Sequence, residues 1–419
     1  MDYITVQQAA EKWNISDRRV RVLCSEGRIP GTVKSGKSYS IPADAPRPND
    51  ARKKQSAQPN KAERYLKWND TVIAVIDGSG MVRFSHPDYN EVVSIYTKGE
   101  SAWSAEQYTE FLSERLVSRD RRDIERILFR LGLSYYDVFQ ISEVTRAIHP
   151  KDLLWIAQST DEQLDGAMTD VFKSVFNQRV DLVGDSIDTP EGYNIKRYGS
   201  YEGQYGIYKQ RMSPLASDIE SEVAVFMLAQ KLGVACCPAY RVGKDTVFSA
   251  FRYDFSKEYI VHFRRFFEGS RLDNEYQNLI AVRPEYTESI MKMILLDFVT
   301  RQDDRHLSNI AIKISEHGEA FYPLYDNGRS LFFEDTEVMV NDAVSDPVKY
   351  ATSFGYSGTY WDYVQEIAAE RKGLIGLLDP SPTKDEIVSI LKEAKIEGYR
   401  FDGALEWITK TLAMIEQLK

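Results

Sequence analysis

The chain has 419 residues, of which 43% are hydrophobic and 28% charged, and its formal net charge is -10. This size and apolar content can bury substantial cores, which excludes a disordered protein and predicts roughly two to four domains. No apolar run approaches the roughly 18 residues that a membrane span needs, and the N-terminus lacks a basic region followed by an apolar one, so we expect neither membrane insertion nor export.

Cysteine usage also points to a cytoplasmic protein. The three cysteines are Cys24, Cys236 and Cys237, without C-x-x-C spacing and without nearby histidines. This pattern predicts neither a disulfide framework nor a zinc site, and it fits a reducing cytoplasm.

Residues 1–45 are predicted to form a winged helix-turn-helix domain. In "ITVQQAAEKWNISDRRVRVLCSEGRIPG", Thr5 and Gln8 can form a capping box on one short helix, and Ser16 can cap a second. The stretch "TVKSGKSYSIP" alternates around Ser35-Gly36, which is typical of a hairpin or wing. The pattern "TVQQAAEKWNIS", an arginine-rich helix and "EGRIPG" resembles the excisionase or MerR-type DNA-binding domains.

The charge distribution agrees with a DNA-binding N-terminus. Residues 1–64 hold 13 Lys and Arg against 7 Asp and Glu, so this segment carries +6 and the remainder -16. In the winged-helix interpretation, the second helix and the wing would contact bases and phosphates through Arg18, Arg19, Arg21, Lys34 and Lys37. One copy would bind weakly, so a homodimer is implied. The alternative is a solvated charged face on a module that binds protein.

A tether and an accessory region follow. Residues 46–64 lie in "PADAPRPNDARKKQSAQPNKAER", which has almost nothing to bury and predicts a flexible linker. Residues 65–165 are expected to be an accessory α/β region, with strands in "TVIAVIDGSGMVRFSH" and a helix in "SAEQYTEFLSERLVSRDRRDIERILFRLGL". Acidic residues alternate with the arginines of this helix, so we expect a solvated helical face with no role in chemistry. The arginines of this face are Arg119, Arg121, Arg122 and Arg126.

The chemistry is expected in "LLDFVTRQDDRHLSNIAIKI", which places Asp304, His306 and Asn309 between two apolar runs. "TESIMKMILLDFV" predicts a buried helix, "NIAIKI" a strand, and "AFYPLYD" a return strand that ends at Asp326. Phosphoryl transfer needs one Asp to orient the attacking hydroxyl, and an Asn and a second Asp to hold magnesium. Each residue alone has a plain structural explanation, such as a turn, but the ordered set indicates kinase chemistry.

At these positions the chain resembles the HipA-like serine/threonine kinases, whose loop has the form D-x-H-x-x-N and whose metal Asp follows one hairpin later. The resemblance implies that Asp304 is the catalytic Asp, that Asn309 and Asp326 bind Mg²⁺, and that His306 organises the loop. "DRHLSN" also resembles the phosphoinositide 3/4-kinase loop, so a lipid or small-molecule kinase stays open.

A kinase also needs a lysine for the nucleotide phosphates and a glutamate that fixes this lysine. "GYNIKRYGSYEGQYGIYKQRMS" predicts a hairpin with Lys196 and Lys209, and Lys209 is favoured because its strand is the last before a helix. That helix, "SDIESEVAVFMLAQKLG", is expected to begin at a Ser217 cap with Glu220 in a capping box. Glu222 is then the better lysine partner, with Glu220 second.

The adenine-binding and phosphate-binding segments are less clearly marked. "TVFSAFRYDF" resembles the strand that joins the two kinase lobes, where backbone groups of Ala250, Phe251 and Arg252 would face adenine. A G-x-G-x-x-G loop is absent, and "LVGDSIDTPEGYNIK" is the nearest substitute. HipA-like kinases also depart from the glycine pattern, and some are silenced by phosphorylation of a serine there, which suggests Ser186 or Thr189.

The sequence therefore predicts an α+β protein in which a winged helix-turn-helix domain precedes a bilobal kinase-like fold. Residues 166–255 would form the β-rich N-lobe and residues 256–419 the helical C-lobe. We expect a cytoplasmic HipA-like kinase that uses ATP and Mg²⁺ to phosphorylate a protein hydroxyl, with a toxin-like role and an antitoxin as a further partner. The alternatives are a transcription regulator with a nucleotide-sensing pseudokinase domain, and a lipid or small-molecule kinase.

Overall fold

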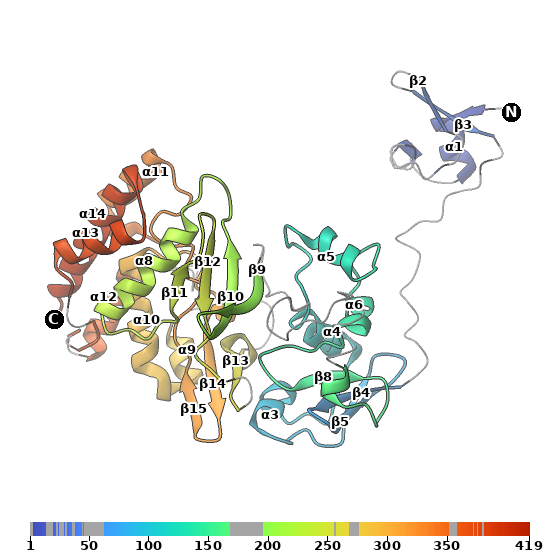
Figure 1. Ribbon diagram of the computed structural model, residues 1–419, viewed down its shortest axis with the longest axis horizontal. Coiled ribbons are helices and arrows are strands. Elements are labelled where there is room, and N and C mark those ends of the chain that lie inside the picture. The colour runs from blue at the N-terminus through green and yellow to red at the C-terminus, as the bar shows by residue number, and fades with distance from the viewer. Residues whose placement is uncertain are drawn as a thin grey trace. The chain divides into compact units, whose positions relative to one another are not determined.

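A computed structural model describes the fold, and the chain divides into two compact units, Met1–Ala62 and Glu63–Lys419. The described residues are 3–13, 20–21, 24, 29, 32–35, 38–43, 45, 63–167, 196–254, 257–267, 276–351, 358–371, 373–374, 376–378 and 381–419. Both units mix helices with strands (Figure 1).

The first unit contains a three-stranded sheet and a helix. The sheet has the order β1-β3-β2, with β1 at Tyr3–Thr5, β2 at Val33–Ser35 and β3 at Ser38–Pro42. Helix α1 spans Val6–Trp13 and begins with the expected capping box, in which the Thr5 amide donates to Gln8 Oε1 at 2.9 Å and the Gln8 amide to Thr5 Oγ1 at 3.3 Å. The expected hairpin is present as β2-β3, whereas most of the second predicted helix, Ser16 included, lies outside the described residues.

The second unit begins with the accessory region. Its five-stranded sheet has the order β7-β6-β5-β4-β8, and all neighbouring strands are antiparallel. The strands are β4 (Arg64–Trp68), β5 (Thr71–Ile76), β6 (Val82–Phe84), β7 (Ala102–Trp103) and β8 (Leu154–Ala157). The helices are α3 (Glu91–Thr97), α4 (Ala105–Ser113), α5 (Ile124–Arg130) and α6 (Val138–Thr145).

The single long helix predicted for the accessory region is wrong, because the segment between α4 and α5 leaves the helix. Arg115 turns inward there, and its guanidinium pairs with Asp152 at 2.7 Å in the interior. Arg121 is likewise buried and binds the backbone of the next sheet. Tertiary hydrogen bonds of this kind override the helical periodicity of the sequence.

A four-stranded antiparallel sheet of order β11-β12-β10-β9 follows (Figure 1). Its strands are β9 (Lys196–Tyr201), β10 (Gln204–Gln210), β11 (Ala239–Arg241) and β12 (Thr246–Ala250). Helix α8 (Asp218–Lys231) lies between β10 and β11 in the chain and packs against β11 and β12. Gly206 of β10 has no room for a side chain, since a Cβ there would lie 2.2 Å from the Ser249 carbonyl oxygen.

The C-terminal part is mainly helical but also holds a sheet of order β13-β14-β15. Its strands are β13 (Tyr259–His262), β14 (Ala311–Ser315) and β15 (Gly318–Phe321). The helices are α9 (Tyr276–Val282), α10 (Thr287–Thr300), α11 (Glu337–Ser345), α12 (Tyr360–Arg371), α13 (Lys384–Glu393) and α14 (Gly398–Glu416), with 3-10 turns η1 (Phe263–Phe266), η2 (Pro284–Tyr286), η3 (Leu307–Asn309) and η4 (Pro347–Lys349). The C-lobe, expected to be helical, thus also contains strands, of which β14 and β15 overlap the segments that the sequence predicts as strands.

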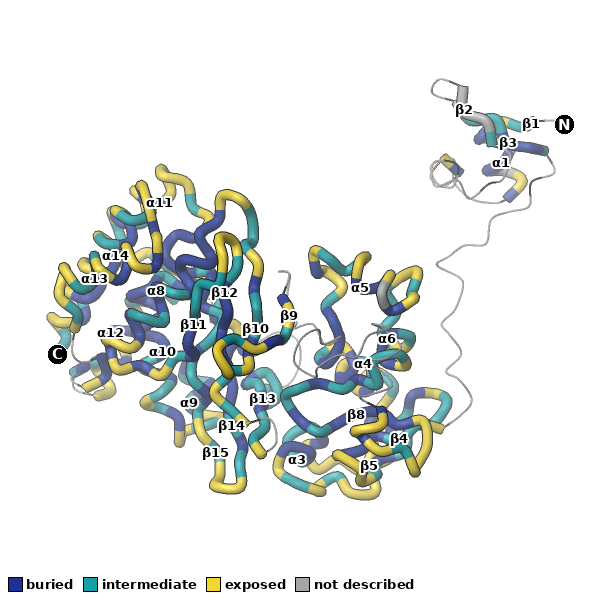
Figure 2. The backbone as a smooth tube through the Cα atoms, in the orientation of Figure 1, coloured by how far each residue is buried: buried dark blue, intermediate teal, exposed yellow. Residues whose placement is uncertain are grey.

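Burial within the second unit is continuous (Figure 2). One hydrophobic cluster includes Ile73 of the accessory sheet, Leu228 of α8, Leu296 of α10 and Trp407 of α14. Helix α10 is buried along most of its length, which fixes the loop that follows it. No helix in the described part of the chain is both long and apolar enough to cross a membrane.

Candidate active site

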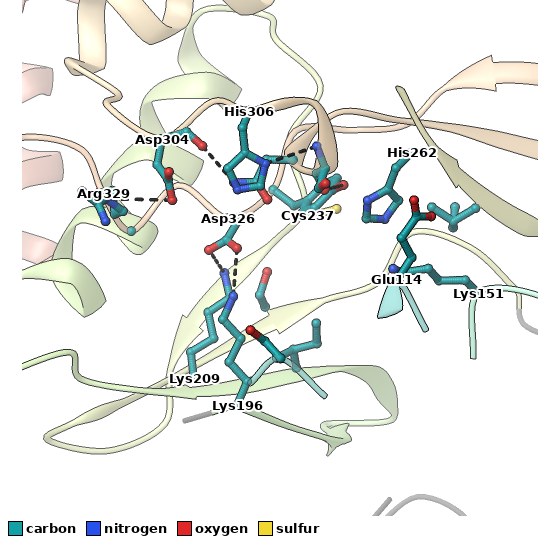
Figure 3. Close-up of a pocket in the computed structure, with 18 of the residues that line it drawn as sticks. Glu114, Lys151, Lys196, Lys209, Cys237, His262, Asp304, His306, Asp326 and Arg329 are labelled. Carbon is teal, nitrogen blue, oxygen red and sulfur yellow. Dashed lines mark hydrogen bonds and ion pairs between the residues drawn. The ribbon is translucent and has the colours of Figure 1, made fainter. Parts of the chain in front are cut away.

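The loop after α10 carries Asp304 and His306 (Figure 3), and hydrogen bonds join both residues to Asn309 or to its neighbours. The Asn309 side chain donates to the Asp304 carbonyl at 2.9 Å, and the His306 amide donates to the same oxygen at 2.9 Å. The His306 ring is exposed and accepts the Ser308 amide at its Nδ1 at 3.2 Å, which begins η3. The Asp304 carboxylate stays 40% exposed, so it is accessible to a substrate hydroxyl.

The side chain that anchors this loop in the interior is Arg305. The Arg305 side chain is fully buried and pairs with Asp297 of α10 at 3.0 Å. It also donates to the Tyr325 carbonyl at 2.8 Å and to Asn327 Oδ1 at 2.6 Å. One guanidinium therefore ties α10 and the catalytic loop to the segment around Asp326.

Asp326 reaches the site by a route different from the predicted one. Strand β15 ends at Phe321, and Leu324 forms a bridge with Cys236 instead of continuing the hairpin. Asp326 then adopts a left-handed backbone conformation, with φ at 57°. Such a conformation is uncommon for a residue with a side chain and is often found at functional sites.

The Asp326 carboxylate is paired with two lysines of the four-stranded sheet (Figure 3). Its Oδ2 lies 2.9 Å from the Nζ of Lys196, and its Oδ1 lies 3.2 Å from the Nζ of Lys209. The two lysines are cross-strand partners on β9 and β10, so they project from the same face. Burial by itself would raise the pKa of the Asp326 carboxyl, but attraction to both lysines outweighs burial and holds this pKa well below its usual value.

Glu222 of α8 completes a group of four charges, in which Lys196, Lys209 and Glu222 are buried and the Asp326 side chain is 29% exposed. Its Oε1 lies 2.8 Å from the Nζ of Lys209, and the two side chains are only 3% and 9% exposed. Burial would lower the pKa of Lys209, but Asp326 and Glu222 raise it above the ordinary value, so this lysine is charged. The structure thus joins Lys209 to Glu222, as expected, and adds Lys196 to the same cluster.

The predicted capping box at the start of α8 is wrong. Ser217 occupies the cap position, but its side chain makes no capping hydrogen bond. Glu220 binds Arg211 instead, at 2.6 Å, and Arg241 at 2.7 Å. Two arginines outcompete a backbone amide for the carboxylate, because charge-assisted hydrogen bonds are stronger than neutral ones.

In the segment expected to face adenine, the backbone N–H groups of Ala250, Phe251 and Arg252 already donate hydrogen bonds within the protein. The amide of Ala250 donates to the Pro238 carbonyl at 2.8 Å and that of Phe251 to the Tyr205 carbonyl at 2.8 Å. The Arg252 amide donates to the Tyr322 hydroxyl at 2.9 Å. None of the three N–H groups is therefore free to meet a purine, and hydrogen bonding to adenine by these residues would have to use carbonyl oxygens.

A cavity of about 940 Å³ unites the groups described so far. It is lined by Lys196, Lys209, Glu222, Ala250, Phe251, Asp304, His306, Asn309 and Asp326. Arg329 lies at its edge, with its Nε 3.0 Å from Asp303 Oδ1 and 3.9 Å from Asp304 Oδ2. A cavity of this size is ample for a nucleotide.

The accessory region, in which the sequence predicts no chemistry, also lines this cavity. Glu110, Glu114, Arg119 and Lys151 line the cavity. The predicted solvated arginine face is wrong at Arg121, whose side chain is 1% exposed. Arg121 Nη2 donates to the Lys196 carbonyl at 2.6 Å, which anchors the start of β9.

Several predicted residues cannot be placed. Ser186, Thr189, Arg18, Arg19 and Lys37 lie outside the described residues. The backbone of Lys34 lies in β2, and Arg21 is exposed on a helical stretch.

Sequence reasoning missed Arg305, Arg329 and Gln302 as parts of the site. Gln302 is buried, accepts the Asp304 amide at its Oε1 at 2.9 Å, and donates to the Asp326 carbonyl at 3.3 Å. All three residues lie within a few positions of the catalytic carboxylates, so charged and amide residues close to the motif were the available signal. Which of them turned inward was not readable from the sequence.

The donor set suits magnesium bound to a nucleotide. Asn309 uses its amide nitrogen internally, which leaves the amide oxygen, and Asp326 supplies a carboxylate at the same cavity. Within the described ranges no three His, Cys, Asp or Glu side chains form a metal site by themselves. Mg²⁺ is commonly held by one or two carboxylates together with substrate phosphates.

Comparisons with known proteins gave structural neighbours only. No protein-family model matches the chain, and no curated protein does. The Helicobacter pylori proinflammatory kinase CtkA aligns over 57% of this chain and 96% of its own, at 14% identity and a TM-score of 0.45. A chain of the Shewanella oneidensis MR-1 complex of HipA, HipB and operator DNA aligns over 84% of this chain and 97% of its own, at 12% identity and a TM-score of 0.46. Both scores are below 0.5, so the assignment that follows depends on the site geometry.

Proposed function

We propose that this chain is a HipA-like protein kinase that uses ATP and Mg²⁺ to phosphorylate a serine or threonine hydroxyl. The observation that carries the proposal is the ion-paired cluster of Lys196, Lys209, Glu222 and Asp326, which lines the same cavity as Asp304. A lysine fixed by a helical glutamate beside a metal-binding aspartate is the arrangement that kinase chemistry requires.

Each residue has a definite task in this proposal. Lys209, held by Glu222, attracts the nucleotide phosphates, and Asp326 with Asn309 holds the metal. Bound Mg²⁺-ATP would supply the phosphoryl group and neutralise the charge that develops on it. Asp304 accepts the proton of the attacking hydroxyl, and its 40% exposure allows this contact.

The decisive experiment is transfer of labelled phosphate from ATP, with Mg²⁺, to the purified protein and to host lysate proteins. Asp304→Ala and Asp326→Ala should abolish the label. Asp402→Ala, an exposed carboxylate on α14, is the matched control and should keep it. Nucleotide binding without transfer in the wild type would favour the pseudokinase regulator, and label on lipid alone would favour a lipid kinase.

We propose further that the first unit binds DNA. Support comes from the +6 charge of residues 1–64, from exposed Arg21 on a helical stretch, and from the β2-β3 hairpin expected of a wing. Titration of duplex DNA with the full chain should show affinity that falls as salt increases, and Arg21→Ala should reduce this salt dependence by about one phosphate contact. Salt-independent or absent binding would favour a protein-binding module.

A further inference from the structure

The main cavity continues beyond the catalytic loop into a groove between the accessory region and the catalytic part. We call this groove the seam, and its wall is formed by Glu110, Glu114, Lys151, His262, Arg264 and Ser308. A second cavity of about 230 Å³ shares Glu110, Glu114 and Arg264 with the first. The seam therefore leads from outside the nucleotide machinery to the loop that carries Asp304 (Figure 3).

The two sides of the seam are held in place by specific contacts. The Ile260 amide donates to the Lys151 carbonyl at 3.0 Å, and the ring centroids of Trp68 and Tyr259 lie 4.9 Å apart. On the catalytic side, the Tyr325 hydroxyl donates to the Ser308 carbonyl at 2.9 Å. These contacts fix the backbone on both sides of the groove.

Arg264 is the distinctive residue of the seam. It follows β13 within η1, it is half-buried, and it lines both cavities. Its guanidinium has no hydrogen-bond or ion-pair partner in the described part of the chain, whereas the neighbouring Arg265 pairs with Glu114 and covers the Tyr96 ring at 4.4 Å. A half-buried guanidinium without an internal partner can bind an external anion strongly.

The charge at the inner end of the seam is positive. Four cationic side chains line this inner end, Arg115, Lys151, Arg264 and Arg265, against one carboxylate, Glu114. Asp152 balances Arg115, and Glu110 adds a negative charge only at the outer wall. The histidines add none, because burial holds the pKa of His149 and of His262 well below the ordinary value. The inner seam is therefore cationic, although residues 65–419 as a whole are acidic.

We infer that the seam is the acceptor site, and that it selects a polypeptide whose phosphorylated serine or threonine lies near an acidic side chain. The acidic group would bind Arg264, supported by the positive charge of Lys151, while the hydroxyl reaches Asp304 in the same cavity. This inference deepens the proposed kinase function and rests on it for the chemistry, but the binding step can be tested separately.

Binding is measured first, by fluorescence anisotropy with labelled serine peptides of one length whose flanking residues are all Glu, all Gln or all Lys. The full-length wild type should bind the Glu peptide about tenfold or more tightly than the Gln peptide. Arg264→Gln should remove most of this difference, and Arg264→Glu should shift the preference to the Lys peptide. Arg371→Gln, an exposed arginine at the end of α12, is the matched control and should change nothing.

Equal binding of the Glu and Gln peptides, or a preference that survives Arg264→Glu, would overturn the inference. Inorganic phosphate that binds alone and displaces the peptide at low millimolar concentration would identify a free-anion site and would also overturn it. Peptide binding that depends on Arg264, without phosphate transfer from ATP, would refute the kinase proposal and leave the binding site standing. Phosphate transfer to all three peptides at equal kcat/KM would refute the acidic selectivity of the seam and leave the proposed kinase activity standing.

Discussion

The ion pair between Lys209 and Glu222 allows a quantitative test of the site through a double-mutant cycle. The variants are Glu222→Gln, Lys209→Met and the combination of both. The pair is a good target because the two atoms lie 2.8 Å apart and the side chains are 9% and 3% exposed. Glu222 has no other hydrogen-bond or ion-pair partner in the described part of the chain, whereas Lys209 also contacts Asp326 at 3.2 Å.

The expected sizes follow from this asymmetry. At an effective dielectric constant of about 20, unit charges 2.8 Å apart attract by about 6 kcal/mol. Desolvation offsets most of this attraction, so the net coupling should be about 2 kcal/mol. Lys209→Met leaves Glu222 buried without a cation and should lower the unfolding free energy by about 3–5 kcal/mol. Glu222→Gln should cost less, about 1–3 kcal/mol, because Asp326 still neutralises Lys209.

The assay is urea unfolding of the wild type and the three variants at pH 7. The dependence of the unfolding free energy on urea concentration must be the same for all four proteins. The exposed pair Lys231–Glu386 has the same 2.8 Å separation at 50% and 42% exposure, so its cycle is the matched control and should give a coupling below about 1 kcal/mol. Additive effects at Lys209 and Glu222, within about 0.5 kcal/mol, would refute the claim that the buried pair acts as a unit.

Three further predictions concern neighbouring residues. Arg305→Leu should destabilise the protein by about 3–5 kcal/mol in urea unfolding, because it leaves Asp297 buried without its partner; wild-type stability would contradict the organising role. Burial raises the pKa of Asp218 to about 6, so this group favours the folded state below about pH 4 and loses that contribution as pH rises through 6. Asp218→Asn should therefore gain stability relative to the wild type at pH 7.5 by up to about 3 kcal/mol, and a gain equal at pH 4 and pH 7.5 would be inconsistent. Gly328→Ala places a Cβ 3.2 Å from both the Asp218 carbonyl oxygen and Glu222 Oε2. Transfer of labelled phosphate should therefore fall, while the free energy of unfolding should change by at most about 1–3 kcal/mol. Full transfer activity would count against a tightly packed site.

Local patterns in the sequence were sufficient to predict the helices and strands that carry the candidate site. The apolar run of α10, the hairpin of β9 and β10, and the helix α8 all follow from periodicity and turn residues that act within a few positions. The order of Asp304, Asn309 and Asp326 along the chain was likewise enough to locate the catalytic loop. Such signals are readable because they depend on neighbours in the chain.

The choices that tertiary structure made all concern polar groups with more than one available partner. Glu220 could cap its own helix or bind Arg211 and Arg241, and only the folded sheet brought the arginines within reach. Arg121 could face solvent, but the Lys196 carbonyl lies where it can be bound, 75 positions away in the chain. A buried charge needs a partner, and that partner is selected by three-dimensional proximity, which no local pattern encodes. The sequence therefore determined the loop of Asp304 and Asn309 and the helices near it, while the tertiary structure decided which lysines, arginines and accessory residues surround that loop.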